Sequence, residues 1–336
     1  MQEILIAGAG PAGTAAAISG LLEGTAVQLI DRARTPRHKV CGEFLSPGAR
    51  HILEGLQVWD EFAALRPCAI RRCALHLGNE TKRWTLSEPG WGLSRLRLDR
   101  LLLEKAQALG AVVRRGDVFD SRREVHSPAS LVLACGRKSS PEPSDRLFGF
   151  KAHFEGPGDD AVELFFDACG YVGVSGVEDG LTNVCGIAPE SLLRRHGFQF
   201  DEVVRRSAPL AERLGPLRRR MPWIAAGPLS FSPPAPGRAR HGVYEAGDAL
   251  GFVDPFTGSG ILNALLTGRL AGQAAAHGIP AEQYRRTCHA RLAHPFLISS
   301  LLRRLASHAA FHGLARVVPG RLLFRWTRAG MAREMR

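Results

Sequence analysis

The first thirteen residues of the chain constrain its fold more than any other stretch. Ile4, Leu5 and Ile6 predict a buried strand that runs directly into a glycine-rich turn, and the small residues that follow the turn predict a helix. In a G-x-G-x-x-G turn, the first glycine permits a tight bend, the second lets the backbone approach a pyrophosphate, and the third lets the helix pack on the strand. We therefore predict phosphate binding by this turn, through Gly8, Gly10, Pro11, Ala12 and Gly13.

A second apolar strand supplies the next part of the pattern. Residues 26–30 end at Asp31, 18 residues after Gly13, close to the spacing of about 20 at which a carboxylate binds an adenosine ribose. Strand, turn, helix and acidic residue together are far more specific than the glycines alone, which occur equally in turns without a ligand. We predict that Asp31 and the adjoining Arg32 take part in cofactor binding.

Composition narrows the class of protein. The chain has 336 residues, of which 45% are hydrophobic and 23% charged, and this length suggests about two domains. No apolar run reaches the roughly 18 residues that span a bilayer, and the first strand follows Met1-Gln2-Glu3 directly, so we expect no signal peptide. Seven cysteines without a C-x-x-C pair indicate a reducing compartment rather than a disulfide framework or a zinc site. We expect a cytoplasmic protein without bound metal.

The net charge of +12 is concentrated at the C-terminus. Residues 281–336 hold eleven arginines against two glutamates, a local charge of +9. No nucleic-acid recognition motif accompanies this charge, and few aromatic residues interleave it, so we expect no nucleic-acid partner. Two interpretations remain: a helical layer packed on the first domain with arginines on its wet face, or an amphipathic basic patch that makes the protein peripheral at an anionic membrane surface.

Periodicity divides the rest of the chain. Residues 49–65 and 201–214 each predict one helix, and residues 69–86 predict a hairpin split at Gly78-Asn79. Between about 148 and 240, short strand-like runs broken by glycine predict an antiparallel sheet, and a proline-rich stretch around residues 231–237 returns the chain to its first domain.

A second glycine-rich entry to a helix follows that return. Residues 242–246 predict a strand, and the segment Gly247 to Ile261 leads into a helix of small residues over 260–276. A simple dinucleotide dehydrogenase has no need of this second site, whereas a longer cofactor with two separate polar regions does.

Four segments, in this order, resemble the FAD-dependent oxidoreductases of the geranylgeranyl reductase and aromatic hydroxylase (group A flavoprotein monooxygenase) superfamily. The first is the glycine turn with Asp31-Arg32. The second, residues 39–47, is similar to the K-x-C-G-G-x-L-S-P segment of the reductase branch, with Glu43 in place of its second glycine. The third, residues 94–99, looks like its S-R-x-x-L-D helix start. The fourth, residues 247–261, looks like G-D-A-A-G-x-x-D-P-x-x-G-x-G-I.

The resemblance implies bound FAD and a set of binding residues. Arg95 would meet phosphate or ribityl oxygens, Asp248 would accept a hydrogen bond from the ribityl chain, and the helix start after Gly258 would face the flavin pyrimidine edge. Simpler roles for the two charged residues are a surface ion pair between Arg95 and Asp99 and a helix cap at Asp248. The remaining residues predicted to contact FAD are Cys41, Gly42, Val118, Gly247, Gly258, Ser259, Gly260 and Ile261.

The resemblance also implies an architecture. We predict an α/β fold with a doubly wound, Rossmann-like FAD-binding domain, an inserted antiparallel β-sheet substrate domain and a helical C-terminus. The FAD-binding domain would comprise residues 1–68, 93–147 and 241–280. The substrate domain would comprise a hairpin at 69–92 and the sheet at 148–240, and residues 281–336 would form the basic helical segment.

Two departures from the family pattern affect the expected chemistry. Cys135-Gly136 stands where the family ends a strand with Asp-Gly, which leaves three electron sources open: NADPH, NADH or a donor protein. Gly173 and Ser175 stand where the reductase branch has Trp and Phe, so we expect a roomier pocket and a substrate other than a slim prenyl chain. The predicted pocket residues are Phe44, Tyr171, Gly173, Ser175, Pro255 and Phe256.

Cys41 has two interpretations. It is either a reactive thiol over the flavin, with a pKa lowered by Lys39 and His38, or a small residue that fits a tight loop. In both cases we expect it near the cofactor.

The leading functional hypothesis is an FAD-dependent oxidoreductase that reduces or dehydrogenates a carbon–carbon bond of a hydrophobic, lipid-, isoprenoid- or polyketide-like metabolite by hydride transfer at flavin N5. The sequence identifies no proton donor and no other catalytic residue. An alternative is a monooxygenase that hydroxylates a hydrophobic or aromatic substrate through a flavin hydroperoxide, although Gly251 stands where many aromatic hydroxylases carry His. A third hypothesis is a non-catalytic flavin-binding sensor or partner protein.

Overall fold

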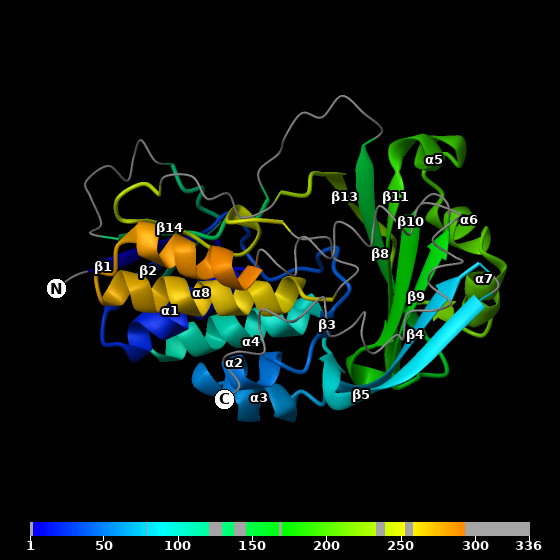
Figure 1. Cartoon of the computed structure of the whole chain (residues 1–336), viewed down its shortest axis with the longest axis horizontal. Coiled ribbons are helices and arrows are strands. Elements are labelled where there is room, and N and C mark those ends of the chain that lie inside the picture. The colour runs from blue at the N-terminus through cyan, green and yellow to red at the C-terminus, as the bar shows by residue number, and fades with distance from the viewer. Residues whose placement is uncertain are drawn as a thin grey trace.

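Two β-sheets organise the part of the chain that the structure describes, one parallel and one mostly antiparallel (Figure 1). The computed structural model describes residues 3–78, 80–120, 130–137, 146–167, 170–232, 239–252 and 258–292. In Figure 1 the parallel sheet and its helices occupy the left half of the molecule and the second sheet the right half. The predicted α/β class with an inserted sheet is confirmed.

The parallel sheet has the strand order β14-β7-β1-β2-β6. Every neighbouring pair in it runs parallel. Its strands are β1 (Glu3–Ala7), β2 (Ala26–Asp31), β6 (Val112–Arg115), β7 (Ser130–Leu133) and β14 (Val243–Glu245). The first strand is therefore central, and an edge position is filled only when the chain returns at residue 243. Because the carboxyl ends of parallel strands share one edge, the segments after β1, β7 and β14 meet there.

Helix α1 (Pro11–Leu22) is buried between the sheet and two further helices, α4 (Arg95–Ala108) and α8 (Gly260–Ala276). The backbones of α1 and α8 touch. A Cβ atom on Gly268 would lie 2.1 Å from the carbonyl oxygen of Ala12, and one on Gly272 would lie 2.3 Å from that of Ala16. The small residues of the helix predicted over 260–276 thus allow α1 and α8 to cross closely.

The second sheet has the order β12-β8-β11-β10-β9-β4-β5-β3, and β13 also pairs with β8. Its strands are β3 (Phe44–Leu45), β4 (Cys68–Leu77), β5 (Glu80–Gly92), β8 (Leu147–Glu155), β9 (Ala161–Asp167), β10 (Gly170–Gly176), β11 (Leu181–Pro189), β12 (Arg218–Arg219) and β13 (Ile224–Leu229). The predicted hairpin is β4–β5. It joins the sheet through β4, which runs parallel to β9, so this sheet is not antiparallel throughout.

Three short helices cover the outer face of the second sheet (Figure 1). They are α5 (Glu190–Arg195), α6 (Phe200–Arg205) and α7 (Ala208–Leu214). Their apolar side chains pack against strand residues that face the helices, such as Phe150 and Val174. The opposite face of the sheet is turned toward the parallel-sheet domain, so side chains that alternate along a strand point either into this helical layer or toward the domain junction.

Two of the predicted helices are wrong in extent. Residues 49–65 form α2 (Ala49–Gly55) and α3 (Trp59–Ala64), because Gln57 has a φ of +55° and leaves the helical region. Residues 201–214 are likewise divided between α6 and α7, with a break at Arg206-Ser207. The apolar stripes that suggested single helices are nonetheless buried, since each half turns its apolar side inward.

The C-terminal segment is described only as far as residue 292, and residues 281–292 are helical. Tyr284 fixes this helix by donating a hydrogen bond to the carbonyl oxygen of Glu245, at 2.7 Å. Pro255, Phe256 and residues 293–336 lie outside the described residues. Among the helices within the described ranges, none has the length and apolar character required to cross a membrane.

Candidate functional site

The glycine turn after β1 has the geometry that its sequence predicts. Gly8 has a φ of +106°, and a Cβ there would lie 2.3 Å from the Ala134 carbonyl oxygen. A Cβ on Gly13 would lie 1.7 Å from the Gly8 carbonyl oxygen. Gly10 faces open space, where the nearest atom to a built Cβ is Arg95 Nη2 at 3.8 Å. Two glycines therefore close the turn, and the third leaves room beside a cation.

Helix α1 starts at this opening without side-chain competition for its N–H groups. Gly10 is the N-cap, Pro11 follows, and the first turn has neither a side-chain cap nor an acidic residue. The unpaired N–H groups and the positive end of the helix dipole favour an anion there. The predicted phosphate-binding residues thus form one continuous cradle.

Asp31 lies beside the turn. Its carboxylate accepts hydrogen bonds from the backbone N–H groups of Ala9, at 2.7 Å, and Ala33, at 2.6 Å. A carboxylate has about four acceptor positions, so the ribose contact predicted for Asp31 is compatible with these two bonds. Asp117 donates its backbone N–H to the Asp31 carbonyl oxygen, and this contact brings the exposed Val118 to the same edge of the sheet.

Arg95 forms an ion pair with Asp99, as the simpler interpretation of its role predicts, but the pair is buried rather than on the surface. The two side chains are joined by contacts of 2.7 and 3.0 Å, and Lys39 contacts Asp99 at 2.8 Å. Burial would raise the pKa of Asp99, but the charges and hydrogen bonds of Arg95 and Lys39 outweigh it and hold that pKa below its usual range. The pair fixes the Arg95 guanidinium beside Gly10, so the two interpretations of Arg95 are compatible.

The second glycine-rich segment lies against the first. Gly247 has a φ of +60°, and a Cβ there would lie 2.8 Å from Ala12 Cβ. Asp248 lies nearby: burial raises the pKa of its carboxyl, and the charges of Arg95 and Arg137 oppose that rise. The structure therefore brings together the turn after β1, the start of α4 and the segment after β14.

The start of α8 lies at the same edge of the sheet. Gly258 has a φ of +64°, Ser259 is the buried N-cap residue, and a Cβ on Gly260 would meet nothing within 4 Å. Ile261 is buried in the core. In the first turn of α8, both side-chain polar atoms of Asn263 are buried without a hydrogen-bond partner among the described residues.

These features fit FAD. One helix start with free N–H groups suits the diphosphate, an acidic residue suits the ribose, and a second helix start with an orphaned amide suits a polar ring edge. Arg95 lies beside Gly10 at the first helix start, and its charge acts on Asp248 in the segment that leads to the second. The contacts of individual residues with FAD remain predictions.

Cys41 is not an activated thiol. Burial raises the pKa of Cys41, and the opposing charge of Arg95 is too weak to reverse this. Of the two interpretations of Cys41, this direction favours the small residue of a tight loop over the thiol with a pKa lowered by Lys39 and His38, and Lys39 is paired with Asp99 instead. Asn183 donates a hydrogen bond to the Cys41 carbonyl oxygen at 3.1 Å, so β11 of the second sheet holds this loop.

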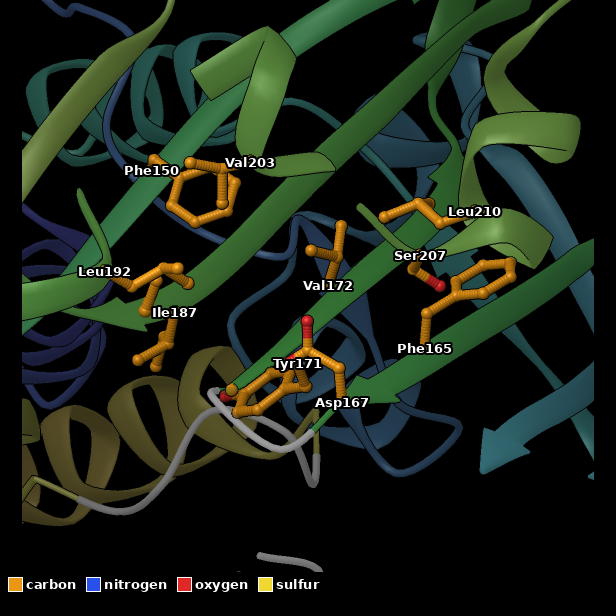
Figure 2. A pocket seen from close by; sticks show the side chains of 12 residues that line it. Phe150, Phe165, Asp167, Tyr171, Val172, Ile187, Leu192, Val203, Ser207 and Leu210 are labelled. Atoms are coloured by element: carbon orange, nitrogen blue, oxygen red, sulfur yellow. The ribbon is translucent and has the colours of Figure 1, made fainter. Parts of the chain in front are cut away.

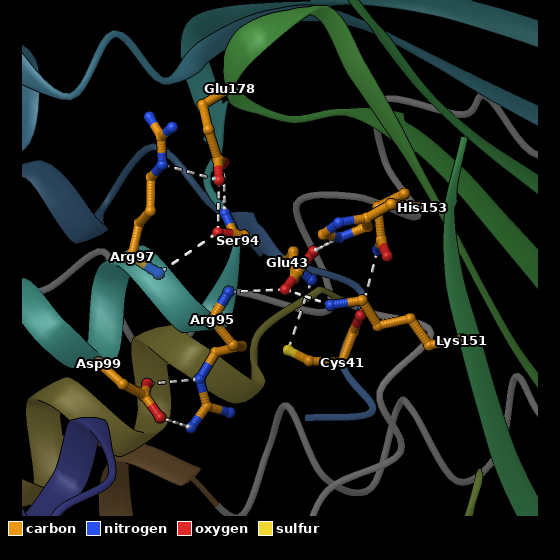
Figure 3. Close-up of polar contacts among 10 residues, drawn as sticks. Cys41, Glu43, Ser94, Arg95, Arg97, Asp99, Lys151, His153 and Glu178 are labelled. Atoms are coloured by element: carbon orange, nitrogen blue, oxygen red, sulfur yellow. Dashed lines mark hydrogen bonds and ion pairs between the residues drawn. The ribbon is translucent and has the colours of Figure 1, made fainter. Parts of the chain in front are cut away.

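Beside Cys41 lies a buried ionic cluster that sequence reasoning missed (Figure 3). Glu43 contacts Lys151, accepts the backbone N–H of Arg95 at 2.6 Å, and lies 2.6 Å from His153 Nε2. Glu43 and Lys151 are fully buried, and His153 is 4% exposed. Two signals were available: Glu43 replaces a glycine of the motif, and Lys151 and His153 alternate along an otherwise apolar strand.

The predicted substrate residues do not all come together. Tyr171, Gly173 and Ser175 alternate along β10 and share one face of the sheet. Tyr171 packs with Phe166 and Ile187 in one apolar cluster, whereas Phe44 packs in a separate cluster with residues of β4 and β5.

A small pocket lies on the helix-covered side of the second sheet (Figure 2). Its lining comes from β8 to β11 and from α5, α6 and α7, and it is mainly apolar. Phe150 and Val172 point into it from the strands, opposite Val203 and Leu210 of the helices. Because this side is turned away from the glycine turns (Figure 1), the pocket is not part of the candidate cofactor site.

Comparison with known proteins agrees with this geometry. Residues 1–129 match the family model described as an FAD binding domain. The chain is 27% identical over 318 residues to digeranylgeranylglycerophospholipid reductase 2 of Methanopyrus kandleri, covering 82% of this chain and 77% of that protein. It is 29% identical over 319 residues to menaquinone reductase of Mycobacterium tuberculosis, covering 81% of this chain and 76% of that protein.

Solved structures share the fold. The flavin-dependent brominase Bmp2 superposes with a TM-score of 0.78 at 18% identity, covering 98% of this chain and 94% of that one. A geranylgeranyl bacteriochlorophyll reductase-like protein from Thermoplasma acidophilum gives a TM-score of 0.76 at 19% identity, covering 99% and 95%. The chain therefore carries an FAD binding domain, and over about four fifths of its length it is similar to proteins named as reductases.

Proposed function

We propose that this FAD-dependent oxidoreductase reduces, or in the reverse direction dehydrogenates, a carbon–carbon bond of a hydrophobic metabolite by hydride transfer. One observation carries the proposal. The similarity to two proteins named as reductases extends over about four fifths of the chain, so it includes the second sheet as well as the FAD-binding domain. Both names describe reductases of lipid-like molecules, which agrees with an apolar substrate here.

The residues of this chain have separable tasks in such a reaction. Bound FAD supplies the hydride chemistry. The glycine turn and the start of α1 hold the diphosphate, and Arg95, fixed by Asp99, offsets its charge. On the second sheet, the apolar cluster of Tyr171, Phe166 and Ile187 offers a surface that excludes water from a hydrophobic substrate. Gly173 and Ser175 widen the adjoining part of this face.

Monooxygenation is the competing reaction, and the products separate the two. The holoprotein is reduced chemically under anaerobic conditions and mixed with menaquinone, with a geranylgeranylated glycerophospholipid and with bulkier unsaturated lipids, because Gly173 and Ser175 predict a substrate other than a slim prenyl chain. Reoxidation of the flavin, with a product that has gained two hydrogen atoms on carbon rather than on the quinone oxygens, is the expected result. Turnover only after oxygen is admitted, with a product that has gained one oxygen atom, would establish a monooxygenase. Turnover of either kind excludes the non-catalytic hypothesis.

The electron donor is tested separately. NADPH and then NADH are mixed anaerobically with the holoprotein while the oxidised-flavin absorbance is followed. Rapid bleaching without substrate is expected if the protein takes hydride directly despite Cys135. Bleaching that requires substrate indicates the gated reduction of a hydroxylase, and no bleaching in either case assigns the electrons to a donor protein or to the substrate.

For the basic C-terminal segment we propose contact with an anionic membrane surface, which suits a lipid-like substrate. The full chain should sediment with vesicles that contain anionic lipid, and added salt should release it. Equal binding to neutral vesicles would contradict an electrostatic contact.

A further inference from the structure

Glu43 has a backbone conformation that its residue type disfavours. Its φ is +54°, in the left-handed region that costs a side-chain-bearing residue free energy and that glycine adopts readily. Glycine is the residue of the similar motif at this position. The chain therefore accepts local strain in order to place a carboxylate here, and such strain is a reason to look for a functional role.

The carboxylate is held from both domains. Lys151 of β8 and the backbone N–H of Arg95 at the start of α4 both contact Glu43 Oε1, and His153 of β8 contacts Oε2. Burial alone would raise the pKa of Glu43, but hydrogen bonds and charges from His153 and Lys151 keep it below its usual value. The Glu43 carboxylate lies 2.6 Å from His153 Nε2, and this contact fixes the orientation of the imidazole ring.

His153 lies next to the predicted substrate face. In the strand register it is paired with Asn183 of β11, and Asn183 is paired on its other side with Ser175 of β10. The Asn183 side-chain oxygen is buried and has no hydrogen-bond partner among the described residues. The row of His153, Asn183 and Ser175 therefore connects the ionic cluster to Ser175, which is predicted to line the substrate pocket.

His38 connects the cluster to its surroundings. Its ring meets the His153 ring edge-on, with centroids 5.2 Å apart, and it is more exposed than His153. Its Nδ1 atom is buried without a hydrogen-bond partner among the described residues. Burial, and then the charges of Lys151 and His153, lower the pKa of His38, so it is suited to relay a proton rather than to hold one.

We propose that His153, oriented by Glu43, delivers the proton in the reduction, that Lys151 keeps Glu43 ionised, and that His38 restores the proton from solvent. This inference rests on the proposed function. The substrate double bond accepts a hydride, supplied by the reduced flavin, at one carbon. Its π electron pair moves to the second carbon, which takes the proton of the His153 imidazolium, so that two C–H bonds replace the π bond. A proton from water then passes through His38 to His153.

The other ionisable groups that face the cluster are Arg95, Glu178, Cys41 and Cys185. Burial raises the pKa of both cysteines, so they remain neutral thiols and do not compete as acids near neutral pH. A metal ion is the other possible use of His38, Glu43 and His153, whose ligand atoms lie within 4.8 Å of one another. The Lys151 ammonium on the same carboxylate opposes a cation there.

The first experiment compares the holoprotein with His153→Gln and with His277→Gln, which removes a surface histidine also paired with a glutamate. His153→Gln should slow product formation roughly 100-fold or more, the usual weight of a positioned general acid. It should also abolish the alkaline fall of the pH–rate profile, while FAD content stays the same. His277→Gln should behave as the wild type. An unchanged rate and pH profile in His153→Gln would overturn the assignment.

A second readout does not depend on turnover. In protein labelled with ¹⁵N-histidine, the His153 signals should show an imidazolium that loses its proton at lower pH in Glu43→Gln. If the single variant folds poorly, the double variant Glu43→Gln with Lys151→Gln, which removes both buried charges, should give a change in the same direction but smaller, because the opposing Lys151 ammonium is lost as well. A neutral His153 in the wild type, or stoichiometric Zn²⁺ binding that shifts the His38 and His153 signals together, would overturn the inference. If the wild type reduces none of the trial substrates, the proposed function fails, while the NMR result still decides the state of His153.

Discussion

At the scale of single residues, removal of either Glu43 or Lys151 from their buried ion pair should strongly destabilise the folded protein. Both side chains are fully buried, and they are in contact. A buried ion pair adds little stability compared with well-packed apolar residues, because desolvation of the charges offsets their attraction. Loss of one partner, in contrast, leaves a charge in a medium of low dielectric constant.

Lys151→Met should therefore lower the free energy of unfolding by about 3–5 kcal/mol. The double variant Lys151→Met with Glu43→Gln should recover much of that loss, because no unpaired charge remains. Denaturation in guanidinium chloride measures both. A single variant that is as stable as the double variant would show that the carboxylate is compensated by His153 and Arg95 alone.

Asp99 gives stability a defined pH dependence. Its folded-state pKa is depressed, so it contributes stability above its unfolded value of about 4 and loses that contribution as the pH falls through the folded value. Asp99→Asn should unfold at a lower temperature than wild type at pH 7, and the difference should shrink below about pH 4. Glu54→Gln, at an exposed helix pair, is the control. A difference that stays constant with pH would show that the Asp99 charge is not its cause.

At the scale of elements, the crossing of α1 and α8 depends on missing side chains. Gly268→Ala would place a Cβ 2.1 Å from the Ala12 carbonyl oxygen, which α1 cannot avoid without moving the phosphate turn. We expect a loss of about 1–3 kcal/mol, typical of overpacking, and weaker FAD retention. Gly260→Ala, in open space at the start of the same helix, should leave the unfolding midpoint unchanged or raise it. Equal midpoints for both variants would contradict the close crossing.

The sequence alone predicts some of these elements and contacts and not others. Patterns confined to one segment were sufficient for β1, the glycine turn and α1, because strand, turn and helix are set by neighbouring residues. The break at Gln57 depends on one positive φ, and the parallel pairing of β4 with β9 joins strands that are far apart in sequence. The ionic cluster was missed for the same reason: its members come from residues 43, 95, 151 and 153, and the local signals at Glu43, Lys151 and His153 do not indicate that these side chains meet.

At the scale of the whole molecule, Glu178 ties the two domains together. Glu178 begins the short helix η1 (Glu178–Gly180), which follows β10 of the second sheet. Its carboxylate accepts hydrogen bonds from Ser94, the N-cap residue of α4. The Ser94 backbone N–H reaches it at 2.7 Å, and Glu178 is 4% exposed. Since α4 also begins with Arg95, this contact couples the second sheet to the cofactor site.

Glu178→Ala should cost about 1–3 kcal/mol, because it leaves a buried donor without an acceptor, and it should speed FAD release. Asp179→Asn is the matched control. Asp179 is exposed and has a positive φ, which asparagine tolerates. Thermal unfolding and flavin release on dilution measure the two effects. A wild-type rate of FAD release in Glu178→Ala would show that the second sheet does not support the cofactor site.

The position of β14 and α8 has a consequence for how the protein is made. The ribosome completes the glycine turn almost at once, yet the strand that extends the sheet and the helix that covers α1 are encoded after residue 240. Domains ordinarily fold from the N-terminus as they are synthesised, but here the nascent chain must hold α1 uncovered until α8 emerges. The cofactor domain is thus begun first and closed late. Nascent chains should depend on chaperones through most of translation, and FAD should be incorporated only into nearly complete polypeptides.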